Sequence, residues 1–315
     1  MDNLVSMRVE YGKALAAYGE QNRRVVVLDA DVSGSTQSHF FAKQHPERFF
    51  NLGVAEAGMV DVAAGLALGG YIPFVNTFAF LIALRAAEQV RTCVAYARTN
   101  VKLVGSYGGL SDSFDGPTHH AITDIALMRA IPNMTVVVPA DAVESAKMVA
   151  AIAEYGSPVY LRLSRAELPL VYDQQHEVEI GKGMMLKEGS DVTLVATGVM
   201  VYRALRAAEE LALEGVEARV LALHTIKPLD EALVLEAAEG TGAIVTCEEH
   251  SIVGGLGAAV AELLGGKRPV PVLRVGVTDR FCESGPYADL LDRYGMSIGD
   301  MVAAAKQAMR LRDNE

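Results

Sequence analysis

The chain has 315 residues, with 28 Lys and Arg against 39 Asp and Glu, and so a formal net charge of −11 at pH 7. This length predicts two domains of about 150 residues each, while the negative charge disfavours nucleic acid and anionic membrane surfaces as partners, since both need a basic surface. The densest apolar run, Phe78–Leu84, has seven residues, and a transmembrane helix needs about 20.

Short β-branched runs alternate with helical segments in the first half of the chain. Predicted strands cover Val25–Asp29, Ile72–Val75, Val101–Gly105, Thr135–Val138 and Val159–Arg162, and predicted helices cover Ala55–Leu68, Ala79–Arg98 and Asp141–Glu154. The last helix begins with a capping pattern, Asp141 followed by Glu144. This alternation is typical of an α/β domain with a parallel sheet covered by helices.

The apolar pattern lapses between Tyr172 and Glu177 into polar residues, as in a linker. We therefore place a domain boundary here, with one domain over 1–175 and a second over 176–315. In the second half, predicted strands cover Val192–Thr197, Ala218–Ala222, Ala243–Cys247 and Val270–Val275, and predicted helices cover Val199–Leu213, Asp230–Ala238, Gly255–Leu264 and Ile298–Arg310. They predict a second, smaller α/β domain with a parallel or mixed sheet.

Glu56 is the only charged residue in a stretch of small and apolar residues at the start of a predicted helix. A carboxyl group withdrawn from water can hold or share a proton near neutral pH, which suits acid–base chemistry. The alternative is a structural glutamate that interacts with the helix dipole.

A glycine-rich loop over 108–120 follows the predicted strand Val101–Gly105, and it carries Asp115, His119 and His120. Glycines let the backbone approach a ligand, while Asp and His supply an acceptor and a group that titrates near neutral pH. A plain turn built on Asp-Gly-Pro is the alternative, although it gives no reason for two consecutive histidines.

Arg8, Ser35 and Arg165 are of the residue types that bind phosphate through charge-assisted hydrogen bonds. Their separation in the sequence does not show that they meet, so each is also compatible with a surface or capping role. The stretch 247–257, Cys-Glu-Glu-His followed by a glycine cluster, lacks Rossmann and P-loop spacing. We expect it to serve close packing at a strand end.

Read in order, these stretches resemble the carboxyl-terminal half of transketolase, from about Arg8 to Ala305. The resemblance rests on the segments 8–15, 28–35, 46–51 leading into Glu56, 115–119 and 226–230. It implies a pyrimidine-binding domain followed by a transketolase C-terminal domain. It also implies thiamine diphosphate-dependent transfer of a two-carbon ketol unit between sugar phosphates, as in pentose phosphate metabolism.

The resemblance also assigns roles to individual residues. Glu56 matches the glutamate that hydrogen-bonds the aminopyrimidine ring and so promotes loss of the thiazolium proton. His119 matches the histidine that positions the donor sugar and moves protons, and Asp115 matches a contact to a sugar hydroxyl. The remaining matches are phosphate contacts at Arg8, Ser35 and Arg165, and positions near the pyrimidine at Asp31, Phe78 and Leu81.

The sequence departs from the family pattern at three places. Tyr107 stands where many members have His, which leaves the donor sugar open. The aromatic residue that stacks on the pyrimidine falls at Leu81, with Phe80 adjacent, so either the clamp is modified or the match is displaced by one residue. The Gly-Asp-Gly motif that holds the diphosphate through a metal ion is absent.

We therefore expect a split enzyme. A separate N-terminal subunit would supply the diphosphate-binding domain and the ligands for Mg²⁺ or Ca²⁺, with no metal ligands on this chain. Because the family is dimeric through these domains, we expect self-association and a heterotetramer.

Two rival enzymes are the beta subunit of a 2-oxo-acid dehydrogenase first component and 1-deoxyxylulose-phosphate synthase. The first needs no phosphate site, and the second normally has all its domains on one chain. A non-catalytic scaffold subunit is a third alternative, disfavoured by the presence of Glu56, Asp115 and His119. The start of the chain lacks a secretory signal, and three widely spaced cysteines, Cys93, Cys247 and Cys282, suit a reducing compartment. We expect a cytoplasmic protein.

Overall fold

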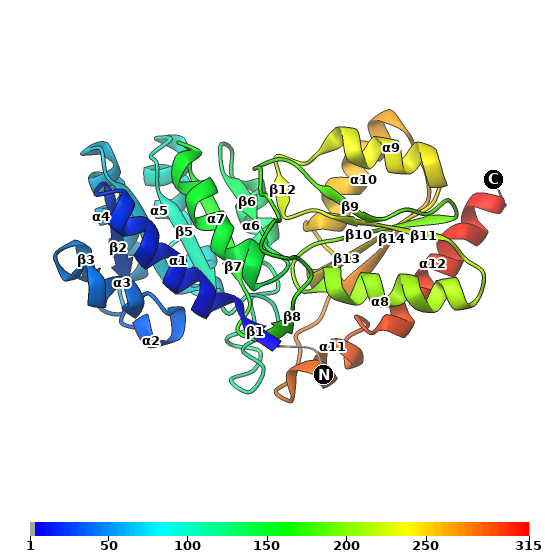
Figure 1. Ribbon diagram of the computed structural model, residues 1–315, viewed down its shortest axis with the longest axis horizontal. Coiled ribbons are helices and arrows are strands. Elements are labelled where there is room, and N and C mark those ends of the chain that lie inside the picture. The colour runs from blue at the N-terminus through cyan, green and yellow to red at the C-terminus, as the bar shows by residue number, and fades with distance from the viewer. Residues whose placement is uncertain (1–3, 315) are drawn as a thin grey trace.

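The computed structural model describes residues 4–314 and shows two large sheets, each covered by helices on both faces (Figure 1). The first sheet has seven strands in the order β12-β6-β7-β5-β4-β2-β3, and all of them are parallel except β12. These strands are β2 (Val25–Asp29), β3 (Phe49–Asn51), β4 (Ile72–Phe78), β5 (Lys102–Ser106), β6 (Thr135–Val137), β7 (Val159–Leu163) and β12 (Thr225–Lys227).

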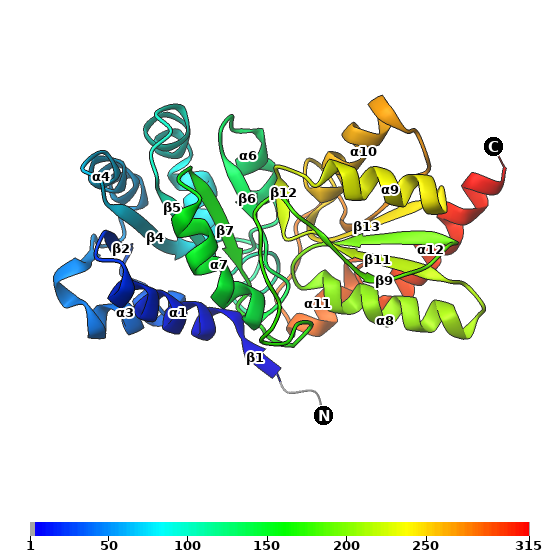
Figure 2. The ribbon, with the colours of Figure 1, turned by 45° about the horizontal axis from the view of Figure 1, so that its top comes forward.

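Helices cover both faces of this sheet, so its central strands are buried on both sides (Figure 2). In β2, Val25 and Val27 join one apolar cluster while Val26 and Leu28 join the other, as the two-residue period of a strand requires. The first cluster is covered by α1 (Met7–Gln21), α3 (His39–Gln44) and α7 (Ala142–Glu154). The second is covered by α4 (Glu56–Leu68), α6 (Asp124–Ala130) and the helical segment 81–96, which contains the short helix α5 (Ala87–Gln89).

The second sheet has five strands in the order β14-β13-β10-β11-β9, with β9 antiparallel to its neighbour. Its strands are β9 (Met184–Lys187), β10 (Val192–Ala196), β11 (Ala218–Ala222), β13 (Ile244–Ser251) and β14 (Val272–Val277). One face packs against α8 (Met200–Leu213) and α12 (Ile298–Asp313), and the other against α9 (Glu231–Thr241) and α10 (Leu256–Lys267). The α/β class with mixed sheets is confirmed.

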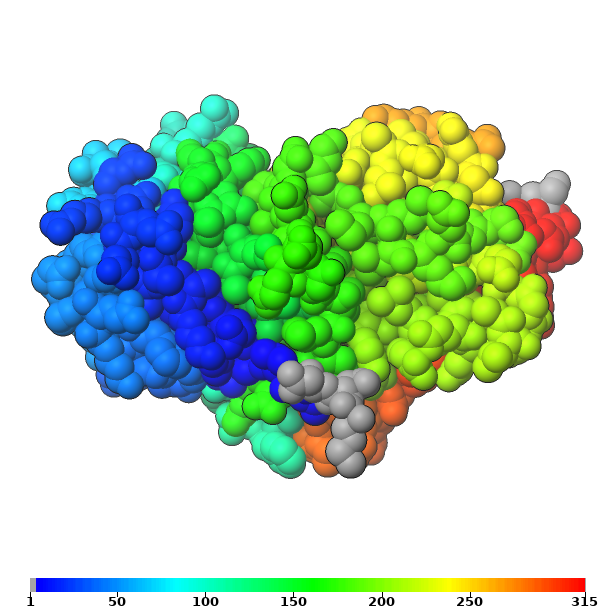
Figure 3. All heavy atoms as spheres, in the orientation of Figure 1, coloured from blue at the N-terminus to red at the C-terminus, as the bar shows by residue number. Residues whose placement is uncertain are grey.

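The two halves are joined by shared structure. β12 belongs by sequence to the second half and pairs with β6 of the first, and one apolar cluster runs from Val26 to Leu256 across both. A ribbon of β1 (Leu4–Ser6) and β8 (Glu167–Pro169) ties the amino terminus to the segment that crosses between the halves, drawn in green in Figure 3. The domain boundary after residue 175 stays a prediction.

The predicted helix Ala79–Arg98 is wrong as a single helix. The chain instead forms π-helical turns over Leu81–Arg85 and Val90–Tyr96, with α5 between them. An apolar period reveals which residues face the core, but it does not fix the hydrogen-bond step of the backbone. Elements that the sequence analysis did not predict include α1, α6, β9 and β12, the short helices α2 (Ser33–Thr36) and α11 (Tyr287–Arg293), and a 3-10 turn over Pro46–Arg48.

No helix within residues 4–314 is both long and apolar enough to cross a membrane.

Candidate active site

The predicted site residues gather at the carboxyl edge of the first sheet. The strands β2, β3, β4, β5 and β7 run parallel, so the segments that follow them emerge at one edge. Ligands of open parallel sheets bind at this edge. The residues carried here are Asp31 and Ser35 after β2, Glu56 after β3, Phe78 to Leu81 at the end of β4, Tyr107 to His119 after β5 and Arg165 after β7. Arg8 joins them from the first turn of α1.

Arg8 and Arg165 both lie against Tyr107. Their guanidinium carbons lie 4.7 and 5.0 Å from the centre of the Tyr107 ring, and Arg8 Nη1 lies 3.3 Å from the Tyr107 hydroxyl. Arg8 also donates to the backbone carbonyls of Ser35 and Arg165. The three predicted anion-binding residues are therefore brought together, although Ser35 contributes its carbonyl to the contact with Arg8. Burial lowers the pKa of Arg8.

The loop that carries Ser35 is held by the buried carboxylate of Asp29. Asp29 accepts hydrogen bonds from the Val32 backbone N–H at 2.6 Å and from the hydroxyls of Thr36 and Ser38, both at 2.8 Å. Burial raises the pKa of Asp29. Asp31, at the start of the loop, is exposed and accepts a hydrogen bond from the Asn51 amide at 2.7 Å.

Glu56 begins α4 and is 1% exposed. The sequence analysis placed it in uncharged surroundings, but Arg85 reaches it from the π-helical turn after β4. Arg85 Nη1 lies 2.9 and 3.2 Å from the two carboxylate oxygens. Arg85 was missed because 29 residues separate the pair in sequence, and nothing in the local pattern links them.

Aromatic rings connect the surroundings of Glu56 with the arginine cluster. The Phe78 ring centre lies 4.6 Å from that of Tyr107, and the Phe80 ring centre lies 5.0 Å from that of His119. Leu81, the first residue of the π-helical turn that ends in Arg85, is 9% exposed. Phe80 thus supplies a ring beside the predicted sugar-binding histidine, while the position matched to the pyrimidine clamp is aliphatic.

The two consecutive histidines of the loop have different surroundings. His119 is partly exposed, and its Nδ1 lies 3.0 Å from the Thr118 hydroxyl. His120 is buried and lines a cavity of about 470 Å³ that also includes Phe80 and Phe281. Burial, with a contribution from His119, lowers the pKa of His120. Asp115 is exposed, with one carboxylate oxygen 3.9 Å from Arg165 Nη1.

The second half of the chain supports this loop. Glu249 in β13 accepts a hydrogen bond from the Leu110 backbone N–H at 2.7 Å, and the Gly285 N–H donates to the Ser113 carbonyl at 3.0 Å. Beneath the loop, the buried Arg162 donates to the carbonyls of Ala121 and Glu249, both at 2.9 Å, and pairs with Asp124 at 2.8 Å. The loop is therefore clamped between the two halves.

Glu248 accepts the backbone N–H groups of Leu256 and Gly257 at 2.7 and 2.8 Å, and so caps α10. This contact agrees with the structural role predicted for the stretch around Cys247. Glu249, the neighbour of Glu248, contacts the 108–120 loop through Leu110, which the sequence pattern did not reveal.

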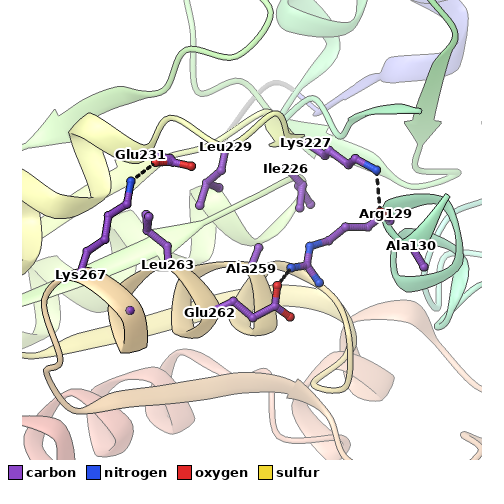
Figure 4. A pocket seen from close by; sticks show the side chains of 11 residues that line it. Arg129, Ala130, Ile226, Lys227, Leu229, Glu231, Ala259, Glu262, Leu263 and Lys267 are labelled. Atoms are coloured by element: carbon purple, nitrogen blue, oxygen red, sulfur yellow. Dashed lines mark hydrogen bonds and ion pairs between the residues drawn. The ribbon is translucent and has the colours of Figure 1, made fainter. Parts of the chain in front are cut away.

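A separate cavity of about 670 Å³ lies between α6, β12 and α10 (Figure 4). The cations that line it are engaged: Arg129 pairs with Glu262, Lys267 pairs with Glu231 at 2.5 Å, and Lys227 donates to the carbonyls of Arg129 and Ile131 at 2.8 and 2.6 Å. Over the described range 4–314, no group of three or more His, Cys, Asp or Glu is placed to hold a metal ion.

Profiles of two known domains match the chain. The transketolase pyrimidine-binding domain matches residues 4–171, and the transketolase C-terminal domain matches residues 181–301. The chain belongs to the transketolase family. The resemblance to its carboxyl-terminal half is confirmed, and with it the two expected α/β domain types and the assignment to a transketolase enzyme.

Three transketolase relatives are similar over nearly the whole chain. A putative transketolase C-terminal section from Methanocaldococcus jannaschii is 44% identical over 300 residues, 94% of each chain. A 6-deoxy-6-sulfo-D-fructose transketolase subunit from Clostridium sp. is 44% identical over 301 residues, 96% of this chain and 94% of its own. A solved structure described as a split gene transketolase, inactive beta4 tetramer, is 48% identical, with a TM-score of 0.92 and coverage of 98% and 99%.

Proposed function

We propose that the chain is the pyrimidine-side subunit of a split transketolase, which transfers a two-carbon ketol unit between sugar phosphates. The observation that supports this most is the position of the Arg8–Tyr107–Arg165 cluster on the same sheet edge as Glu56. A 2-oxo acid carries no phosphate group, so the rival reaction needs no phosphate site at that edge.

The residues around Glu56 fit the aminopyrimidine of thiamine diphosphate. A buried carboxylate offers a hydrogen-bond acceptor to a ring nitrogen, and the apolar side chains of Leu81 and Phe78 offer contact to the ring. When bound, the cofactor supplies the carbon atom that attacks the ketose carbonyl. Glu56 holds the pyrimidine by its ring nitrogen, and Arg85 must share the carboxylate or release it. Asp31 lies at the rim of this region in the proposal.

The sugar is bound by the clamped loop. Asp115 accepts a hydrogen bond from a sugar hydroxyl, and His119 positions the donor and moves a proton at a sugar oxygen. Arg8, Arg165 and the Ser35 loop bind the anionic end of the substrate through charge-assisted hydrogen bonds. The Tyr107 ring contacts both guanidiniums.

A partner subunit supplies the diphosphate-binding domain, with its Mg²⁺ or Ca²⁺ ligands. Several apolar side chains near Glu56 and along α4 are exposed, among them Val54 at 70%, Leu84 at 57% and Leu68 at 78%. Contiguous exposed apolar surface marks interaction sites. We propose that it is covered by a second copy of this chain and by the partner, in a heterotetramer that acts in the cytoplasm. The similar tetramer described as inactive contains beta chains only, so we expect this chain alone to be inactive.

Native purification of the chain, with mass spectrometry of what co-purifies, tests the proposal first. A second chain that carries Gly-Asp-Gly allows a ketol-transfer assay on the complex with added thiamine diphosphate and Mg²⁺. Because one relative is named for a sulfonated sugar, donors with a terminal phosphate and with a terminal sulfonate should both be assayed. Transfer from either supports the proposal. A complex that binds the cofactor but transfers no ketol unit overturns it and favours a scaffold.

A further inference from the structure

Asp112 is a fully buried carboxylate inside the arginine cluster. Its Oδ1 lies 2.5 Å from Arg165 Nη1, while its Oδ2 has no hydrogen-bond partner in the structure. A carboxylate of Asp115 lies 3.9 Å from the same Arg165 nitrogen. Arg165 therefore faces two carboxylates where a phosphate-binding guanidinium is expected to face a vacant anion site.

Arg8 is engaged differently. Its donors go to uncharged oxygens, namely the Tyr107 hydroxyl and the carbonyls of Ser35 and Arg165. The cluster thus contains two guanidiniums and two carboxyl groups, so that its formal charge is zero when all four are ionised. An incoming anion gains attraction from Arg8 and Arg165, but it meets repulsion from Asp112 at close range in a partly buried site. Burial, together with the Asp115 carboxylate, raises the pKa of Asp112.

We propose that Asp112 sets charge selectivity at the anion site, by reducing the advantage that a substrate end with two negative charges has over one with a single negative charge. This inference rests on the proposed function, because it assumes that Arg8 and Arg165 receive the anionic end of the sugar. Attraction to the two guanidiniums and repulsion from the fixed carboxylate both grow with the charge of the ligand, so Asp112 cancels part of the affinity that a second negative charge would add.

The accessibility of the cluster permits this role. The Arg165 side chain is 40% exposed, so an anion can reach its free donors from solvent while Asp112 stays buried behind it. Ser111, next to Asp112, fixes the backbone here: its hydroxyl donates to the Gly108 carbonyl at 2.6 Å and accepts from the Arg165 N–H at 3.0 Å. The backbone beside Asp112 is thus tied to two other parts of the site.

Calorimetric titration of the full chain with methyl phosphate and with methanesulfonate at pH 8 tests the inference. At this pH the first is a dianion, because its second pKa is about 6, and the second is a monoanion. The variant Asp112→Asn keeps the shape and removes the charge. We expect it to tighten methyl phosphate binding by about tenfold or more and methanesulfonate binding by clearly less. The exposed Glu239→Gln, with the same loss of charge far from the site, should change neither.

Two further variants make the outcome decisive. Asp112→Ser repeats the loss of charge with a smaller side chain, in case the amide rearranges Arg165. Arg165→Gln should abolish the gain produced by Asp112→Asn when the two are combined, since Asp112 acts at that guanidinium. Unchanged or weaker methyl phosphate binding in folded Asp112→Asn and Asp112→Ser overturns the inference and leaves the anion site standing. If neither anion binds to any variant, the anion site of the proposed function fails as well.

Discussion

The Glu249 carboxylate accepts a hydrogen bond from the backbone N–H of Leu110 at 2.7 Å, although 139 residues separate them in the chain. Glu249 lies in β13 of the second half, and Leu110 lies in the loop that carries Asp115 and His119. The second half of the molecule therefore fixes the backbone from which the predicted sugar-binding side chains project.

The contact depends on Gly109. This residue has φ +64°, and a Cβ added to it would collide with the Glu249 carboxylate. Gly109→Ala should therefore displace the loop, raising the Michaelis constant for the sugar donor by about tenfold or more in the reconstituted enzyme. Gly265→Ala is the matched control, because the same added methyl group meets no atom within 4 Å there. Equal kinetics in the two variants would mean that the loop position does not depend on Glu249.

Glu249 also makes stability depend on pH. Burial raises its pKa to about 7 in the folded chain, against about 4.3 for an unfolded glutamate. The folded state thus binds more protons between these values, so the contribution of Glu249 to the free energy of unfolding falls as pH rises from about 4.3 to 7. Glu249→Gln should remove this loss. Denaturant unfolding of both proteins at pH 5 and pH 8 should show that the free energy of unfolding of the variant, relative to that of wild type, is higher at pH 8 than at pH 5. A difference in the free energy of unfolding that is the same at pH 5 and pH 8 would contradict the raised pKa of Glu249.

The regular part of this architecture was predictable from the sequence, and the long-range contacts were not. The strands β2 and β11 have the predicted bounds, because runs such as Val25–Leu28 are aliphatic and follow charged residues. α1 was missed although Ser6 accepts a hydrogen bond from the Val9 N–H and so caps its start. Its apolar residues are interrupted by polar ones, and its burial comes from packing against α7.

The same division applies to the candidate site. Glu56, Asp115, His119 and Arg165 were found by their residue types and by the family resemblance, but their partners Arg85, Asp112 and Glu249 were not. Each of these three residues contacts a partner that is distant in the sequence, and no local pattern marks the contact. Such pairings arise from the order of strands in the sheet, which a single sequence does not encode in any local period.

Glu56→Gln tests the acid–base role proposed for Glu56. The amide keeps the size of the side chain, so assembly with the partner and the melting temperature should change little, while ketol transfer should be lost. The reason is that an amide cannot accept a proton as the carboxylate can. Turnover is measured in the reconstituted complex, and the assembly state by sedimentation. Normal turnover would remove Glu56 from its proposed role. Glu239→Gln on the exposed side of α9 serves as the control for the chemical change itself.

Arg165→Ala tests the proposed anion site by removing one of its two guanidinium groups. We expect the Michaelis constant for a phosphorylated sugar to rise by about tenfold or more, and that for the unphosphorylated analogue to rise much less. Because the change leaves Asp112 buried without its partner at 2.5 Å, Arg165→Ala should be compared with the double variant Arg165→Ala, Asp112→Asn. Equal effects on both sugars in both variants would place Arg165 outside the anion site.

Lys102 is a buried cation whose ionisation opposes folding. Its side chain is fully buried in β5, and its Nζ donates to the Ser157 carbonyl at 2.7 Å. Burial lowers its pKa to about 7, against about 10.4 in an unfolded chain. The unfolded state therefore binds more protons between pH 7 and 10.4, and the penalty on folding is largest below pH 7 and disappears as pH rises through this window.

Lys102→Met removes the charge and keeps the apolar stem, so we expect it to raise the free energy of unfolding at pH 6 by a few kcal/mol, less the value of the lost hydrogen bond. The gain should shrink steadily towards pH 10. Denaturant unfolding at several pH values measures it, with Lys43→Met, at an exposed position of α3, as the control expected to stay flat. A gain that does not vary with pH would show that the pKa of Lys102 is the same in the folded and the unfolded chain.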